Sequence, residues 1–369
     1  MQLETYITDV IEGRRKVRWI RGILHALSHL MKAGVKLRHF AFNYAILKKQ
    51  KVAVPVVSIG NIVAGGTGKT ALVEKLGKEL SCKGKLAVLS RGYRSKLGRR
   101  KQELHLLNPS HVSPELCGDE PYLLFKALPG AAIFVGKNRV ASAKRAAYQS
   151  VDLIFLDDGM QYRRLHRDLE IVMLQASDLY GKGFFLPRGY LRDFPERLAC
   201  ADYLFAHGVF DANHYDVVRK TLARYSAAPV IGTKMKAQRV MTSLGEEWLG
   251  LEEKRVGVFC GLGHPTSFFQ TVRSFGGDIV EQWKLPDHVA PKEKELRRFA
   301  QLCERKHCDL LLCSEKDWVK LPSNLSSLPL PIGWLKASIE IVAGAKLYKQ
   351  LLRKLEIYLE HKENCEALD

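Results

Sequence analysis

The sequence lacks the marks of several large classes of protein. It has no run of 18 or more uncharged apolar residues, the length that a membrane-spanning helix needs. Acidic residues such as Glu4 and Asp9 interrupt the start before the apolar core of a signal peptide could form, so we expect no signal peptide. No internal repeat, low-complexity stretch or C-x-x-C pair is visible. These absences leave a chain that is soluble or that lies on a membrane surface.

Acidic residues are few relative to basic ones, and the cysteines are scattered. The 369 residues include 58 Lys and Arg against 39 Asp and Glu, a formal net charge of +19. Such a charge favours polyanionic partners: nucleic acid, anionic lipid or phosphorylated substrates. Most of the eight cysteines sit in apolar runs, where a reduced thiol acts as a small hydrophobe, and this favours a reducing cytosol.

Strand patterns that alternate with helical patterns predict an α/β fold. From about 232 to 254 the pattern weakens into polar and turn residues, and a new strand–glycine–helix unit begins at Val256. We therefore predict a mostly parallel sheet with helices on both faces, divided into a segment 1–50, a first domain 51–240 and a smaller α/β domain 241–369. The expected strands are 52–59, 85–90, 131–135, 151–156, 170–174, 256–260, 279–283 and 309–313, and the expected helices are 71–80, 137–149 and 291–308.

The segment 14–50 is basic and amphipathic. Its apolar residues recur at helical spacing and are surrounded by lysines and arginines. A helix of this kind can lie in a lipid headgroup layer. It can equally dock on the neighbouring domain with its cations in solvent, and the segment alone does not separate the two interpretations. The stripe consists of Trp19, Ile20, Ile23, Leu24, Leu27, Leu30 and Met31.

A glycine-rich loop between an expected strand and an expected helix carries the strongest chemical signal. The run S-I-G-N-I-V-A-G-G-T-G-K-T ends in the G-K-T of a Walker A loop, whose backbone amides surround phosphate oxygens. Lys69 is expected to reach the β- and γ-phosphates of a nucleoside triphosphate, and the Thr70 hydroxyl to hold Mg²⁺. The first glycine of the usual pattern is replaced by Val63. The predicted nucleotide-binding residues are Val63, Ala64, Gly65, Gly66, Thr67, Gly68, Lys69 and Thr70.

Carboxylate pairs supply further candidates. Asp157 and Asp158 follow four apolar residues and are expected at the carboxyl edge of the sheet, where ligands of open α/β sheets bind. Capping of a turn explains one of these carboxylates but not easily both. Asp119 and Glu120 open an expected helix, where acidic residues are ordinary. Asp287–His288 alone is more often a surface turn than a catalytic pair.

Taken together, the ordered motifs resemble the tetraacyldisaccharide 4'-kinases, the lipid A 4'-kinases of Gram-negative bacteria. The resemblance covers roughly 14–330, and the family's own loop also lacks the glycine that Val63 replaces. The matching motifs are V-x-x-G-N-I-x-x-G-G-T-G-K-T (57–70), S-R-G-Y (90–93), G-D-E-P (118–121), D-D-G-M-Q-Y-R-R-L-x-R-D (157–168), G-L-G-H-P (261–265), P-D-H (286–288) and E-K-D-x-V-K-L (315–321).

The resemblance implies transfer of the γ-phosphate of ATP to the 4'-hydroxyl of an acylated glucosamine disaccharide 1-phosphate. It further implies that Asp119 is the general base, that His288 is its partner from the other domain and that Glu120 belongs to the metal shell. Asp157 and Asp158 match the second acidic motif of the family, and the resemblance implies that they are catalytic residues together with Lys69. Met160, Tyr162 and Val289 depart from the residues that the family usually has.

A lipid acceptor also favours one of the two interpretations of the segment 14–50, contact with a membrane surface, over docking on the neighbouring domain. An acylated disaccharide phospholipid sits in a bilayer, which favours contact of this segment with the anionic surface of the inner membrane, on its cytoplasmic face. We expect no nucleic-acid partner and infer no obligate protein partner. Two alternatives remain: a P-loop enzyme acting on another acceptor, and a basic nucleic-acid-binding ATPase, which would lack the zinc, aromatic and helix-turn-helix patterns of known classes.

Overall fold

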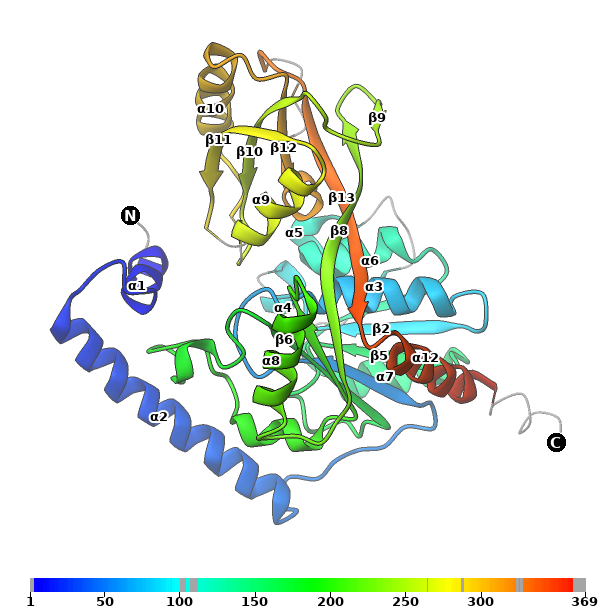
Figure 1. Ribbon diagram of the computed structural model, residues 1–369. Helices are drawn as coiled ribbons and strands as arrows, with labels where there is room; N and C mark the ends of the chain where they lie inside the picture. The colour runs from blue at the N-terminus through cyan, green and yellow to red at the C-terminus, as the bar shows by residue number, and fades with distance from the viewer. Residues whose placement is uncertain are drawn as a thin grey trace.

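The computed structural model describes residues 3–93, 95–99, 104–106, 112–263, 265–286, 289–322, 325 and 328–360. Within them the chain forms one 13-stranded sheet with helices on both faces (Figure 1). The strand order is β11-β10-β12-β13-β8-β7-β6-β1-β5-β2-β4-β3, with β9 paired to β8. Most neighbours are parallel, and this confirms the predicted α/β class.

The first part of the sheet surrounds β1, which pairs in parallel with β5 on one side and β6 on the other. Its described strand residues are mostly apolar and buried because helices cover both faces of the sheet. The strands are β1 (Val56–Gly60), β2 (Leu86–Ser90), β3 (Leu104–Leu106), β4 (Ala132–Val135), β5 (Leu153–Asp157), β6 (Leu169–Gln175) and β7 (Tyr203–His207). The helices are α3 (Lys69–Leu80), α4 (Lys96–Arg99), α5 (Pro114–Cys117), α6 (Asp119–Ala127), α7 (Arg139–Tyr148) and α8 (Ala212–Leu222), with 3-10 turns η2 (Gly181–Gly183) and η3 (Pro195–Cys200).

The second part continues the same sheet. The strands are β8 (Val230–Thr242), β9 (Glu247–Trp248), β10 (Arg255–Cys260), β11 (Asp278–Lys284), β12 (Leu310–Ser314) and β13 (Ile332–Ala343). The helices are α9 (Pro265–Ser274), α10 (Glu293–Arg305), α11 (Glu315–Trp318) and α12 (Ala345–Glu360). Leu351 and Leu355 of α12 pack in the same core as Leu76 and Leu80 of α3, so the chain returns to the first part after β13. The domain boundaries at 50 and 240 stay a prediction.

The interpretation of 232–254 as polar turns is wrong. The first half of that segment, 232–242, belongs to β8, a 13-residue strand that pairs antiparallel with β13 from Gly232 to Thr242. The middle of β8 is half exposed and rich in lysine, and this hid the strand pattern. Together β8 and β13 connect the two parts of the sheet (Figure 1).

Two helices precede the sheet, α1 (Leu3–Ile11) and α2 (Arg18–Asn43). The long α2 runs along the outside of the first part of the sheet (Figure 1). Among the described residues, no helix combines the length and the apolar character needed to cross a bilayer. Helix α2 nevertheless has many exposed apolar side chains, including Trp19, Ile23, Leu27 and Leu30.

Gly60, the last residue of β1, fixes how closely the phosphate loop approaches the acidic loop. A Cβ at this position would lie 2.5 Å from Met160 Cβ and 2.7 Å from its backbone nitrogen. Backbone atoms of the loop after Asp157 therefore occupy the space that a side chain would need. Only glycine lets the end of β1 pass this loop without displacing it.

We predict that Gly60→Ala lowers the thermal unfolding midpoint by several degrees, because overpacking costs about 1–3 kcal/mol. Gly34→Ala is the matched control: a Cβ there meets nothing within 4 Å, and alanine in a helix is favoured over glycine by up to about 1 kcal/mol. Calorimetry or circular dichroism measures both. Equal midpoints for the two variants would contradict the packing argument.

Candidate functional site

The glycine-rich loop lies between the end of β1 and the start of α3, at the centre of the first part of the sheet. Gly65 and Gly68 have φ values of 108° and 87°, a region that glycine enters without strain. Gly68 is the N-cap of α3, and Lys69 and Thr70 form its first turn. The free amides and the positive end of the helix dipole therefore face the loop, as an anion site requires.

A second segment runs beside the first half of the loop. The Ala64 amide donates to the Tyr190 carbonyl at 2.7 Å, the Arg192 amide donates to the Ile62 carbonyl at 2.8 Å, and Val63 pairs with Leu191. Inside the loop, Asn61 Nδ2 donates to Thr67 Oγ1 at 3.0 Å. The segment 190–193 thus holds the conformation of 61–64.

Asp157 and Asp158 come together with the loop, as predicted. β5 ends at Asp157, and its register against β1 places that residue beside Ile59. Ser90 Oγ donates to Asp157 Oδ2 at 3.3 Å, whereas Oδ1 of this buried carboxylate has no hydrogen-bond partner among the described residues. Burial, followed by the charges of Glu120 and Asp158, raises the pKa of Asp157. A cation placed here would relieve that cost.

Asp158 forms the electrostatic centre of the site. Arg192 donates to both carboxylate oxygens, at 2.9 and 2.7 Å, and Lys69 Nζ lies 3.4 Å from Oδ1. Burial acts to raise the pKa of Asp158, but Lys69 and Arg192 outweigh it and lower the pKa well below the usual range. The carboxylate therefore stays ionised and joins three separate parts of the chain.

Sequence reasoning missed two arginines of this site. Arg192 also donates to Asn61 Oδ1, and Arg139 is buried at the start of α7, where Nη1 donates to the Asp158 carbonyl at 3.0 Å. Burial lowers the pKa of Arg139. In a chain with 58 basic residues, a single arginine carries no local signal. The contacts of both residues with Asp158, and the burial of Arg139, are visible only in the structure.

Asp119 and Glu120 open α6 at the boundary with the second part of the sheet. Lys316 Nζ lies 3.2 Å from Glu120 Oε1, and Lys320 Nζ lies 3.9 Å from Asp119 Oδ2. Asp119 and Lys320 also line a pocket of about 190 Å³ with residues from both parts, among them Tyr93 and Ala290. The structure thus brings the G-D-E-P and E-K-D motifs together across the boundary.

Other predicted residues are placed differently. His288 and Asp287 lie outside the described residues, so the role of His288 stays a prediction. Arg163, which belongs to the motif 157–168, is buried and donates to Asn43 Oδ1 of α2 at 3.0 Å.

The donor set fits a magnesium ion. Mg²⁺ binds through one or two carboxylates, phosphate oxygens and water rather than in a dedicated protein cage. Among the described residues no group of three or more His, Cys, Asp or Glu side chains forms such a cage. Asp157 Oδ1, which has no hydrogen-bond partner in the described part of the chain, provides a buried oxygen of the required kind near the phosphate loop. Thr70 and Glu120 remain the predicted metal-binding residues.

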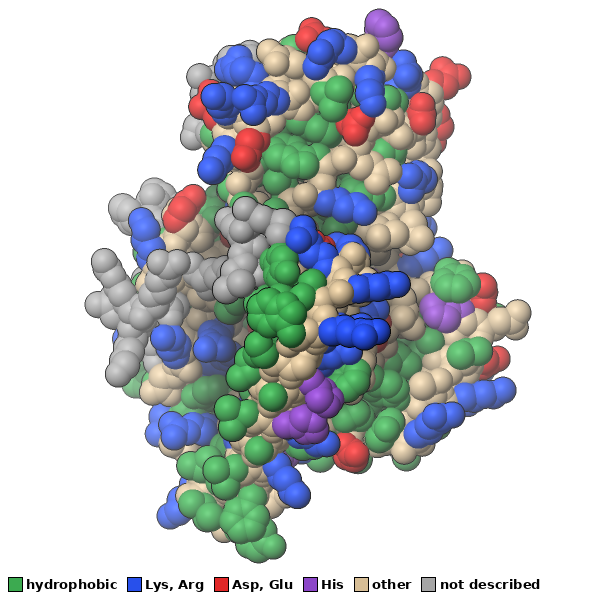
Figure 2. Space-filling model, turned by 90° about the vertical axis from the view of Figure 1, so that its left-hand side faces the viewer, with side chains coloured by type: hydrophobic (Ala, Val, Ile, Leu, Met, Phe, Trp, Pro, Cys, Tyr) green, Lys and Arg blue, Asp and Glu red, His purple; other side chains and the backbone are tan. Residues whose placement is uncertain are grey.

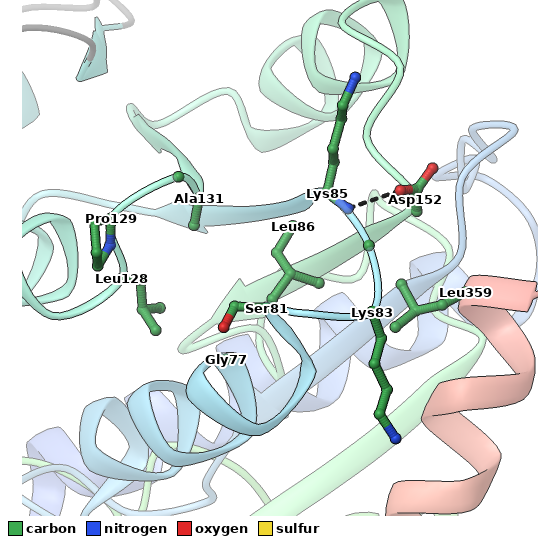
Figure 3. A pocket seen from close by; sticks show the side chains of 12 residues that line it. Gly77, Ser81, Lys83, Lys85, Leu86, Leu128, Pro129, Ala131, Asp152 and Leu359 are labelled. Carbon is green, nitrogen blue, oxygen red and sulfur yellow. Dashed lines mark hydrogen bonds between the residues drawn. The ribbon is translucent and has the colours of Figure 1, made fainter.

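The larger cavity lies elsewhere. It has a volume of about 410 Å³ and is lined by residues from the C-terminal half of α3, the start of β2 and the end of α12, such as Gly77, Leu86 and Leu359 (Figure 3). The Lys85 amide donates to Asp152 Oδ2 there at 2.7 Å. Gly77 stands eight residues after Lys69, about 12 Å along the helix, so this cavity is separate from the phosphate loop.

Curated relatives share most of this chain. A tetraacyldisaccharide 4'-kinase of Chlamydia trachomatis is 35% identical over 352 residues, which are 94% of this chain and 92% of the relative. The Pasteurella multocida protein of the same name is 33% identical over 304 residues, covering 82% and 86%. The Chlamydia pneumoniae protein is 41% identical over 282 residues, covering 74% and 75%.

A solved structure has the same fold. LpxK from Aquifex aeolicus, crystallised in an "apo" form in complex with ATP, matches with a TM-score of 0.67 and 28% identity, covering 90% of this chain and 99% of that one. The family model for LpxK, tetraacyldisaccharide-1-P 4'-kinase, matches residues 20–356. With this match, the phosphate loop and the acidic pair, the chain belongs to the tetraacyldisaccharide-1-P 4'-kinase family.

Proposed function

We propose that this protein transfers the γ-phosphate of ATP to the 4'-hydroxyl of a tetraacyl-glucosamine-disaccharide 1-phosphate, a step of lipid A biosynthesis. The observation that carries the proposal is the ion network of Lys69, Asp158 and Arg192 at the start of α3, within a chain of this kinase family. Phosphoryl transfer requires mainly positioning and charge neutralisation, which a P-loop, its lysine and a nearby acidic pair provide.

In this proposal the loop amides and Lys69 hold the β- and γ-phosphates. Thr70 and Glu120 would hold Mg²⁺ with the carboxylates of Asp157 and Asp158 close by, and the ion would neutralise charge on the phosphate oxygens. When ATP binds, its charge competes with Asp158 for Lys69, while Arg192 still neutralises Asp158.

Asp119 is the proposed general base for the 4'-hydroxyl. It opens α6, lines the pocket between the two parts of the sheet and lies within 3.9 Å of Lys320. A hydroxyl in this pocket would lie between elements of both parts, which helps to exclude water. His288, which lies two residues before Ala290 in the sequence, is its proposed partner.

The assay that tests the proposal combines ATP, Mg²⁺ and a tetraacyl-disaccharide 1-phosphate in detergent micelles. We predict that Lys69→Ala lowers the rate of phosphate transfer at least about 100-fold, because a charge-stabilising donor is lost. Lys78→Ala on the same helix is the control, since Lys78 pairs with Glu74 at the surface, and its rate should stay within about twofold. Full activity of Lys69→Ala would contradict the site.

We predict that Asp119→Asn lowers kcat by about 10²- to 10⁴-fold, the usual contribution of a general base, while the Kd for ATP changes little. Asp216→Asn, an exposed carboxylate on α8, is the control and should retain wild-type kcat. Isothermal titration with ATP and the micelle assay give the two quantities. If Asp119→Asn instead abolishes ATP binding and keeps kcat at saturation, the assignment of the base is wrong.

We further propose that α2 contacts an anionic membrane surface, the cytoplasmic face of the inner membrane. A band of hydrophobic side chains follows this helix on the surface of the molecule, with lysines and arginines beside it (Figure 2). Trp19 and Leu30 are 69% and 71% exposed. Apolar side chains flanked by cations suit the boundary between headgroups and acyl chains, where the acylated acceptor resides.

We predict that the double variant Trp19→Glu, Leu30→Glu loses most of its binding to vesicles of phosphatidylglycerol and phosphatidylethanolamine without a lower unfolding temperature. The matched control is Leu244→Glu, Leu249→Glu, near the β8–β9 turn, where the two leucines are 72% and 77% exposed. Vesicle cosedimentation measures binding. Equal loss in both variants would show that added negative charge alone, and not the α2 surface, determines binding.

A further inference from the structure

Helix α2 has two different faces. Trp19, Ile23, Leu27, Leu30 and Leu37 are exposed and recur at spacings of three, four and seven, along one side. The buried residues of the helix recur at spacings of four and seven, on another side. They are Leu24, Ser28, Val35 and Phe42. One face of α2 therefore contacts the protein while the other remains available for a surface.

The buried face also carries a charged contact. His39 Nε2 lies 2.6 Å from Asp193 Oδ1, and Arg38 Nη2 donates to Asp193 Oδ2 at 3.3 Å. The Asp193 side chain is completely buried. A buried carboxylate is stable only where cations or hydrogen bonds compensate for its lost hydration, so this contact fixes the position of Asp193 against α2.

Asp193 is the neighbour of Arg192, and their side chains reach in different directions. Arg192 binds Asp158 through two hydrogen bonds and also donates to Asn61, which in turn donates to Thr67 of the phosphate loop. The amides of Arg192 and Asp193 both donate to the Ile62 carbonyl, at 2.8 and 3.2 Å. A chain of direct contacts thus runs from α2 through 192–193 to the nucleotide site.

A second contact leads from the end of α2 to the acidic loop. Arg163 donates to Asn43 Oδ1 at 3.0 Å and lies over the Phe42 ring, with 4.9 Å between Cζ and the ring centroid. Arg163 is five residues after Asp158. The C-terminal end of α2 is therefore connected to the segment that holds Arg192 and to the loop that carries Asp158.

We propose that α2 positions the nucleotide site as well as contacting lipid, and that His39 is a positioning residue that acts on the phosphate loop through Asp193 and Arg192. The inference rests on the proposed kinase function for its meaning, but its test measures nucleotide binding directly. His39 touches neither phosphate nor acceptor in this scheme. It orders the segment that holds Arg192 in place before ATP binds, so its removal lowers the affinity for ATP.

The test compares His39→Leu, His39→Gln and His29→Leu in the full-length protein. Titration with a fluorescent ATP analogue gives the Kd, and the micelle assay gives KM for ATP, KM for the lipid acceptor and kcat. We expect His39→Leu to raise the Kd and the KM for ATP about tenfold or more, because the buried Asp193 loses a charge-assisted partner. The KM for the lipid acceptor should stay unchanged.

His39→Gln keeps a nitrogen donor near the position of Nε2 and should restore the Kd to within about threefold of wild type. His29→Leu makes the same chemical change at an exposed position of the same helix and should bind ATP like wild type. All variants should still bind anionic vesicles. A wild-type Kd for His39→Leu, or a Kd for His39→Gln as weak as that of His39→Leu, overturns the proposal.

Asn43→Ala covers the case in which His39→Leu does not fold. Asn43 is exposed, so its truncation should leave the fold intact while releasing Arg163, and we expect a two- to threefold weaker Kd for ATP. An unchanged Kd for Asn43→Ala then overturns the proposal that α2 positions the nucleotide site. If wild type binds ATP but transfers no phosphate, the proposed function fails, and the comparison of Kd values still decides the role of His39.

Discussion

The site depends on one carboxylate, that of Asp158, held between Lys69 and Arg192. A half-buried anion requires compensating charge, and here the compensation comes from segments 89 residues before and 34 residues after it in the sequence. The contacts of Lys69 and Arg192 with the Asp158 carboxylate therefore hold the phosphate loop, the end of β5 and the segment 190–193 in one arrangement. The site is ordered by this charge before a nucleotide arrives, which lowers the cost of binding.

Sequence patterns predicted those parts of the site that depend on residues close together in the sequence. The Walker loop needs glycines at fixed positions before a helix, and the acidic pair needs an apolar strand before it, so both are visible as patterns. Arg192 and Arg139 have no such pattern, because their roles arise from partners 34 and 19 residues away that only folding brings near. Strand β8 was missed because its middle is half exposed and rich in lysine, and the partner that makes it a strand, β13, lies about 100 residues later.

The two sequence interpretations of the amphipathic segment describe different faces of one helix. Docking explains the buried face with Val35, His39 and Phe42, where apolar contact and the hydrogen bond between His39 and the buried Asp193 hold α2 against the protein. Docking leaves Trp19 and Leu30 mostly exposed, and theirs is the face that we propose for lipid. Periodicity could not separate these roles because both faces contain apolar residues.

Contact of α2 with lipid on one face and with the protein on the other, as we propose, would have a thermodynamic consequence. A ligand that favours one position of α2 also favours the arrangement of 190–193 that this position supports, and coupling of this kind acts equally in both directions. Binding of lipid to the exposed face and binding of ATP to the loop would therefore assist each other. The energy involved is bounded by the few contacts that transmit it, those of Asp193 with His39 and Arg38 and that of Arg163 with Asn43. Such a link would favour ATP binding by the enzyme when it lies on the membrane that holds its acceptor.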